Sequence, residues 1–360
     1  MFKVALITRN RMENLETQSP PNKKKFWQYL IILVVLGLAV NLLLPQISDL
    51  TRSWQVVKQM TWWLVGLAVT AEVFSYLSYG YCLHAIVSLH GKKLATPKGA
   101  LIAMAATSVG LVAGGWFAAT GSLFSSVRRE TNDGTIATMA GILPTMLLNL
   151  SIEVIAVLGI IYLAIIGKLT SSQLIQYAIF LLLLTISTFG YLLVLVWPKQ
   201  TYRLINAVLW RWSRIRKKPY NPQKTHDMIN NVILSWKELA RGNWHKPMLG
   251  AFANILFDML AMFMIFQAAN YHIPIGVLFA SYGIPYLLAK MAFIFPGGIG
   301  VVEASMAAIQ TSLGVPDEIS VVAILGYRLL SFWIPTLLGF VAMGYLSRAN
   351  NNQKVPLPQE

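Results

Sequence analysis

The chain has 360 residues, of which 56% are hydrophobic and 12% are charged, and its formal net charge is +15. Soluble globular domains carry about 25% charged residues, so this composition excludes a water-soluble enzyme and predicts an integral membrane protein. The mean hydropathy of +0.58 agrees with that prediction. Because the positive charge gathers in a few segments between hydrophobic ones, we interpret it as a determinant of membrane orientation and not as a nucleic-acid surface.

Six hydrophobic segments have about the 20 residues that a helix needs to cross a bilayer. They are residues 26–45, 62–89, 135–166, 174–197, 247–269 and 319–346. Their hydrophobic residues do not alternate as those of barrel strands do, so we predict an all-α polytopic membrane protein. Residues 26–346 then form a single transmembrane domain between two polar tails, residues 1–25 and 347–360.

Lysine and arginine concentrate in the N-terminal tail, near Lys92 and in the segment 199–245. The positive-inside rule places these three regions and both termini in the cytoplasm, and we expect the bacterial inner membrane as the location. The segment 199–245 also contains hydrophobic and aromatic residues. We interpret it either as an amphipathic helix on the anionic inner leaflet or as an ordinary basic loop.

Two further hydrophobic segments, 99–127 and 275–313, are interrupted by glycine. If residues 99–127 crossed the membrane once, the basic segment 199–245 would lie outside, against the charge rule. We therefore predict two re-entrant hairpins, which make residues 62–166 and 247–346 an inverted-topology repeat; the alternative is eight ordinary spans. The glycines expected at the turns are Gly110, Gly114, Gly115 and Gly121 in the first hairpin, and Gly297, Gly298 and Gly300 in the second.

The second hairpin contains a proline- and glycine-rich turn that is followed by a carboxylate. Its residues are Pro296, Gly297, Gly298, Gly300 and Glu303. Proline and glycine permit a tight turn and leave amide groups unshielded at the start of a helix, where an anion such as phosphate is favoured. A second motif, residues 326–335, places Arg328 well inside the last predicted span.

Together, over residues 296–335, these motifs resemble the flippase-like transmembrane domain of lysylphosphatidylglycerol synthetases and its stand-alone membrane-protein relatives. The first hairpin resembles that family more loosely, through Gly121 and Arg128. The resemblance extends over about residues 26–346 and leaves no segment for a cytosolic synthetase domain. It therefore implies a protein that handles lipid without synthesising aminoacyl-lipid.

Several ionisable residues lie within the hydrophobic segments. They are Glu72, Glu153, Asp258, Lys290, Glu303 and Arg328. Each costs about 2.5–3.5 kcal/mol at the centre of a membrane helix, so we expect them to face the interior and to find partners. We interpret them as the lining of a headgroup site between the repeats, where Arg328 binds phosphate. Glu303 would then orient Arg328, or receive a cationic headgroup or a proton. The alternative is that Arg328 pairs permanently with Glu303 or Glu153 and locks helices together.

The function expected from these features is translocation of an anionic phospholipid or lipid-linked phosphate between leaflets. The alternative is a membrane partner that presents lipid to a separate synthetase or glycosyltransferase without transporting it. We expect no enzyme activity, cofactor or metal, because the five histidines lack metal-ligand spacing and no nucleophile–base set is present. Membrane lipids are the expected partners, with a second copy of the chain or a lipid-modifying enzyme left open as protein partners.

Overall fold

The computed structural model describes residues 53–113, 115–172, 244–291 and 298–351, together with short stretches and single positions between 175 and 233. All of them belong to one compact unit, Gln46–Glu360. The predicted span 26–45, most of the span 174–197 and most of the basic segment 199–245 lie outside the described residues.

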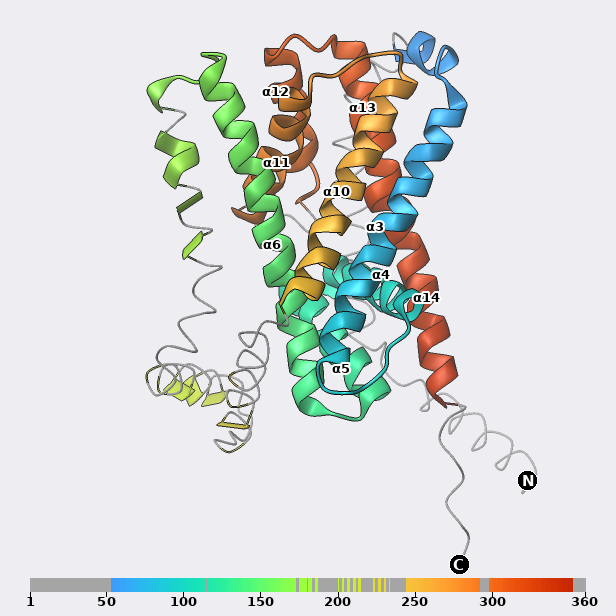
Figure 1. Ribbon diagram of the computed structural model, residues 1–360, viewed down its shortest axis with the longest axis vertical. Coiled ribbons are helices and arrows are strands. Elements are labelled where there is room, and N and C mark those ends of the chain that lie inside the picture. Colours follow the sequence, from blue (N-terminus) through green and yellow to red (C-terminus); the bar gives the residue numbers. More distant parts are fainter. Residues whose placement is uncertain are drawn as a thin grey trace, which may run out of the picture. The chain divides into compact units, whose positions relative to one another are not determined.

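The described elements of this unit are all helices, and no strand occurs among the described residues, which confirms the all-α prediction. The helices are α3 (Trp62–Ser88), α4 (Thr96–Ala113), α5 (Trp116–Thr131), α6 (Gly134–Ile165), α10 (His245–Ala268), α11 (Ile275–Met291), α12 (Val301–Ser312), α13 (Asp317–Arg328), the π-helical turn η3 (Leu329–Trp333) and α14 (Ile334–Asn351) (Figure 1).

Three of these helical stretches are long and apolar enough to cross a membrane: α6, α10 and the continuous Asp317–Leu346, which runs through α13, η3 and α14. They coincide with three of the predicted spans. Helix α3 has 27 residues and matches a fourth predicted segment. It is not one of the three helical stretches named above. The total of six spans stays a prediction.

Each glycine-interrupted segment forms two helices that are separated by a break. Gly115, with φ +68°, precedes α5, and Gly300, with φ +83°, precedes α12. Gly121 lies inside α5 and Gly110 inside α4, so the prediction that they form the turn is wrong. Gly110 serves close packing, since a Cβ built there would lie 3.0 Å from the Ala119 Cβ.

In the first helix pair, the start of α4 lies close to the end of α5. Lys98 in the first turn of α4 forms an ion pair with Glu130 near the end of α5, with 2.5 Å between Nζ and Oε2. Just beyond α5, Asn132 has φ +54°, and Asp133 then caps α6 by accepting hydrogen bonds from the amides of Thr135 and Ile136. Figure 1 shows α5 beside the lower part of α6, α4 near α14, and α11 and α12 beside the upper part of α6.

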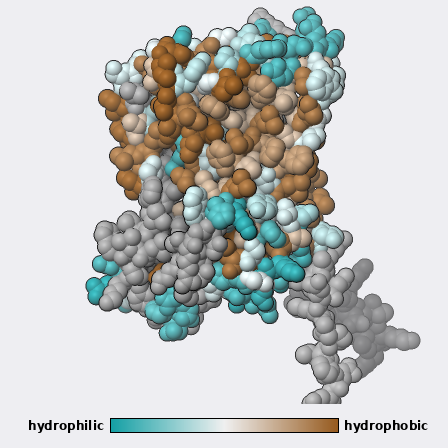
Figure 2. Space-filling view, in the orientation of Figure 1, coloured by the Kyte–Doolittle hydropathy of each residue, from teal (hydrophilic) through white to brown (hydrophobic). Residues whose placement is uncertain are grey.

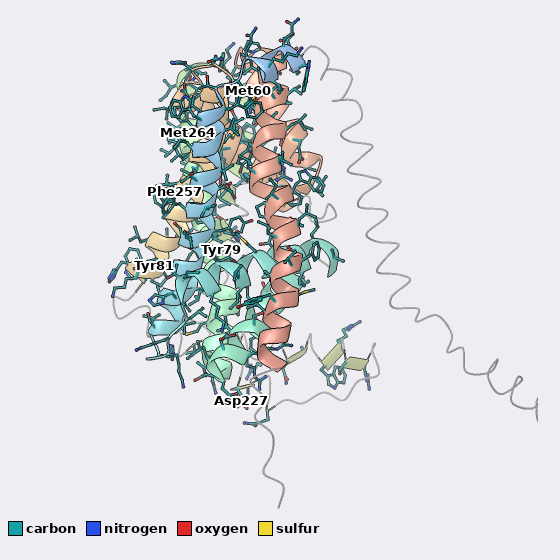
Figure 3. All side chains as sticks on the ribbon, turned by 90° about the vertical axis from the view of Figure 1, so that its right-hand side faces the viewer. Met60, Tyr79, Tyr81, Asp227, Phe257 and Met264 are labelled. Atoms are coloured by element: carbon teal, nitrogen blue, oxygen red, sulfur yellow. The ribbon has the colours of Figure 1, made fainter. Side chains whose placement is uncertain are left out.

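Helices α3 and α10 form the most extensive helix pair, and they run antiparallel. The amide of Thr61, before α3, donates to the carbonyl of Ala268 at the end of α10 over 2.8 Å. Midway, the Asn254 amide donates to the carbonyl and hydroxyl oxygens of Ser75. The ring of Phe257, labelled in Figure 3, stacks on that of Phe74 with 5.5 Å between the centroids.

Large hydrophobic side chains are exposed on the outer faces of α3, α6 and α14. They include Leu67, Val73, Phe74, Val154, Leu158, Ile161, Leu337, Val341 and Met343. Figure 2 shows hydrophobic residues over most of one face, with hydrophilic residues at its upper right and along its lower edge. Soluble proteins rarely expose apolar patches beyond a few hundred Å², so this surface is of the kind that helices present to lipid.

Candidate functional site

Ionisable and tyrosine side chains from five helices meet in the interior of the unit. This polar cluster consists of Glu72 on α3, Asp258 on α10, Tyr282 and Tyr286 on α11, Glu303 on α12, and Tyr327 and Arg328 on α13. The hydrophobic core around α10, α11 and α13 encloses it. Polar groups buried in this way are retained only where they have partners or a ligand.

Arg328 and Glu303 form a buried ion pair, with side chains 3% and 8% exposed. The guanidinium Nε donates to Glu303 Oε1 over 2.6 Å. The second carboxylate oxygen, Oε2, accepts the amide of Gly300 over 2.7 Å. The glycine turn therefore does two things: it starts α12, and it positions Glu303 to hold Arg328. Of the predicted possibilities, Glu303 as the residue that orients Arg328 agrees with this geometry.

One nitrogen at the other end of the Arg328 guanidinium has no partner among the described residues. Its central carbon lies 4.3 Å from the centroid of the Phe332 ring, a cation–π distance. Nη2 is buried and has no hydrogen-bond partner within the described part of the chain. An unpaired buried donor of this kind costs about 1–3 kcal/mol, and an oxygen ligand bound at Nη2 would remove that cost.

Asp258 is the acceptor at the centre of a tyrosine network. Tyr282 donates its hydroxyl to Asp258 Oδ2 over 2.5 Å, and Tyr327 donates to the same oxygen over 2.8 Å. The hydroxyl of Tyr286 lies 2.7 Å from that of Tyr327. Since Tyr327 directly precedes Arg328, this network connects α10 and α11 to the residue that carries the buried positive charge.

Glu72 meets the same network from α3. Its side chain is hydrogen-bonded to Asp258 across the α3–α10 interface. Its other oxygen, Oε2, is buried and has no partner among the described residues. The predicted acids Glu72 and Asp258, which belong to the two halves of the predicted repeat, are therefore brought together.

The remaining predicted residues are described only by their burial, backbone geometry or local contacts, or lie outside the described residues. Glu153 is 5% exposed on α6, and Gly298 is buried with φ +66°. Arg128 is exposed in the last turn of α5, with its guanidinium 5.9 Å from the centroid of Phe124. Nothing in these contacts connects Arg128 to the polar cluster, and its role in binding stays a prediction. Outside the described positions lie Pro296, Gly297 and the side chain of Lys290.

The tyrosines are the part of the cluster that sequence reasoning missed. Tyr282 and Tyr286 are four residues apart in a hydrophobic helix, so they share one face of α11. A tyrosine hydroxyl at membrane depth needs a partner, and this spacing was the available signal. Across the described residues, no group of three or more histidine, cysteine or acidic side chains is arranged to hold a metal ion.

Residues 28–339 match the protein family described as the lysylphosphatidylglycerol synthase TM region. The inner membrane protein YbhN of Escherichia coli K12 is 24% identical over 327 residues, which is 88% of this chain and 90% of that protein. A UPF0104 membrane protein of Methanocaldococcus jannaschii is 25% identical over 138 residues, 38% of this chain and 41% of the relative. Another, from Pyrococcus horikoshii, is 42% identical over 53 residues, 15% and 16% of the two chains. The matches thus span less than half the length of the archaeal relatives.

Proposed function

The chain belongs to the lysylphosphatidylglycerol synthase transmembrane family, as its motifs predicted, and from this membership we propose that it translocates an anionic phospholipid or lipid-linked phosphate between leaflets. The proposed location is the bacterial inner membrane, in keeping with the 24% identity to the inner membrane protein YbhN. Translocation breaks no covalent bond, so the proposal includes no enzyme activity.

The observation that carries this proposal is the buried Arg328 with its unpartnered Nη2. Guanidinium is a forked donor that matches the oxygens of phosphate. In the described structure Nε donates to Glu303, and Nη2 has no partner among the described residues. A lipid phosphate at Nη2 would satisfy the donor, while the acyl chains stay against the hydrophobic helices.

We further propose that the two helix pairs are re-entrant hairpins of an inverted repeat with cytoplasmic termini. The Lys98–Glu130 ion pair supports this, because it joins the start of α4 to the end of α5. The packing also has reciprocal partners: α4 packs against α14 of the other half, and α11 packs against α6. Such repeats place their substrate sites between the halves, which is where Glu72 and Asp258 meet. Alternating access would then expose the polar cluster to one leaflet at a time.

Substitution of Arg328 tests the proposed site. In proteoliposomes with fluorescent phosphatidylglycerol, Arg328→Ala is expected to slow translocation on the order of 10- to 100-fold, because a hydrogen bond to a charged group contributes about 1.5–3 kcal/mol. Arg129→Ala, at the exposed end of α5, provides a matched control. Unchanged transport by folded Arg328→Ala protein would exclude this site.

Cysteine labelling tests the hairpins. The single cysteine, Cys82, is 0% exposed, so it gives little background. Cysteines introduced at the exposed Lys92 and Arg129 are expected to react with a membrane-impermeant maleimide from the cytoplasmic side, and a cysteine at Lys168 from the opposite side. Reaction of positions 92 and 129 from opposite sides would show that residues 99–127 cross the membrane once.

A second candidate function is lipid presentation to a separate synthetase or glycosyltransferase without transport. The observation that favours it is the short Arg328–Glu303 contact of 2.6 Å, which also fits a permanent lock between α12 and α13. This function predicts that the protein co-purifies with a lipid-modifying enzyme and shows no translocation when reconstituted alone. A second copy of the chain is the other protein partner that we propose to test for, by native mass spectrometry.

A further inference from the structure

Two carboxyl groups meet between the most extensively packed helices of the unit, α3 and α10. Glu72 is 7% exposed, and its Oε2 has no partner among the described residues. Its side chain is hydrogen-bonded to Asp258, while the hydroxyls of Tyr282 and Tyr327 both donate to Asp258. A carboxylate only accepts hydrogen bonds, so a bond between two carboxyl groups needs one proton. Because two hydroxyls donate to Oδ2 of Asp258, and hydrogen bonds to a carboxylate favour its charged form, the proton of this bond is assigned to Glu72.

Among the described residues, no positively charged side chain forms an ion pair with Glu72. The groups that interact with it electrostatically are Asp258, Tyr76, Tyr282 and Tyr286. Among the other described elements nearby, α13 contributes Tyr327 and Arg328, α12 contributes Glu303 and α6 carries the buried Glu153. Lys98 on α4 pairs with Glu130. Arg328 is already paired with Glu303 and also faces Asp258.

We propose that Glu72 is the proton-binding residue of the translocase, and that one proton enters the site together with each anionic headgroup. This inference rests on the proposed function and names its coupling ion. With Glu72 neutral, the polar cluster holds one positive charge, on Arg328, and two negative charges, on Glu303 and Asp258. When Glu72 loses its proton, it adds a third negative charge beside Asp258.

The proton state of Glu72 therefore controls how readily a phosphate approaches Arg328. A third carboxylate repels the incoming phosphate and competes with it for the guanidinium, so headgroup binding is favoured when Glu72 is protonated and release is favoured when it is not. The connection is short, because Asp258 accepts from Tyr327, the neighbour of Arg328 in α13. By linkage, bound lipid holds the proton on Glu72 to the same degree.

Infrared spectroscopy tests the proton directly, without transport. At neutral pH the wild-type protein is expected to show the C=O stretch of a neutral carboxyl group in a hydrophobic environment. Glu72→Gln should abolish this band, because its amide donates to Asp258 in place of the carboxyl proton and preserves the hydrogen bond. Asp317→Asn, at an exposed position in α13, is the matched control and should keep the band. A band that persists in Glu72→Gln overturns the proposal.

Transport under a pH gradient tests the coupling. For one proton per lipid, a pH difference of one unit is expected to shift the leaflet distribution of fluorescent phosphatidylglycerol by up to about tenfold in wild-type proteoliposomes. Glu72→Gln should transport lipid with no response to the gradient, and Asp317→Asn should behave as wild type. A full response in Glu72→Gln contradicts the inference while translocation stands. No translocation by wild type contradicts the proposed function, and the infrared band then still decides whether Glu72 holds the proton.

Discussion

Glu303→Gln is expected to destabilise the protein by about 3–5 kcal/mol, because it leaves the buried Arg328 charge uncompensated. The side chains of the pair are 3% and 8% exposed, so water cannot replace the lost carboxylate. The apparent midpoint of thermal unfolding should fall on the order of 10 °C. A thiol-reactive dye can measure it, since the single cysteine, Cys82, is 0% exposed in the folded protein.

A double substitution separates the stability of this pair from its function. Replacing both partners by hydrophobic residues of similar volume, Glu303→Leu with Arg328→Met, removes the buried charges together and is expected to recover most of the lost stability. The same double variant should translocate no lipid, because it lacks the guanidinium. If it transports as wild type does, the pair is a structural lock and nothing more. If Glu303→Gln unfolds at the wild-type temperature, the buried pair does not hold α12 and α13 together.

Gly283→Ala is expected to destabilise the protein by about 3 kcal/mol, since it forces apart two helices whose backbones touch. A Cβ at Gly283 on α11 would lie 2.5 Å from the Cα and the amide nitrogen of Ala156 on α6. Those are backbone atoms, which cannot rotate away as a flexible side chain would. Gly159, on the α6 side, makes the reciprocal approach, with its built Cβ 2.7 Å from Ala280 Cα. The same dye assay on Cys82 measures the change.

The matched control for this substitution is Gly66→Ala on α3. A Cβ at Gly66 meets no atom within 4 Å, and alanine is favoured over glycine in a helix by about 0.5–1 kcal/mol. This variant should unfold at the wild-type temperature or slightly above it. Equal stability of the Gly283→Ala and Gly66→Ala variants would mean that α6 and α11 are farther apart than the structure places them.

The sequence alone was sufficient for the helical class, for the family, and for Gly115 and Gly300 as glycines at the helix breaks, although not for Gly110 and Gly121, which lie inside helices. A bilayer leaves the backbone no partner except itself, so hydrophobic segments of spanning length are necessarily helical. Breaks required glycine because the chain adopts positive φ at Gly115, Gly298 and Gly300. Arg328 and Glu303 were identifiable because an ionisable residue in a hydrophobic segment is costly and therefore informative.

Only the tertiary structure decided which of these residues meet. The polar cluster includes three tyrosines that were not predicted, Tyr282, Tyr286 and Tyr327. Arg128 was predicted, but it lies exposed at the end of α5. Glu72 and Asp258 were both predicted, but their mutual contact depends on how α3 and α10 are rotated against one another. In a soluble helix the hydrophobic face reveals this rotation. The sequence of a helix that is hydrophobic on all sides does not reveal its rotation. Here the rotation is set by close packing at Gly250, Gly159 and Gly283, and it decides which polar side chains meet.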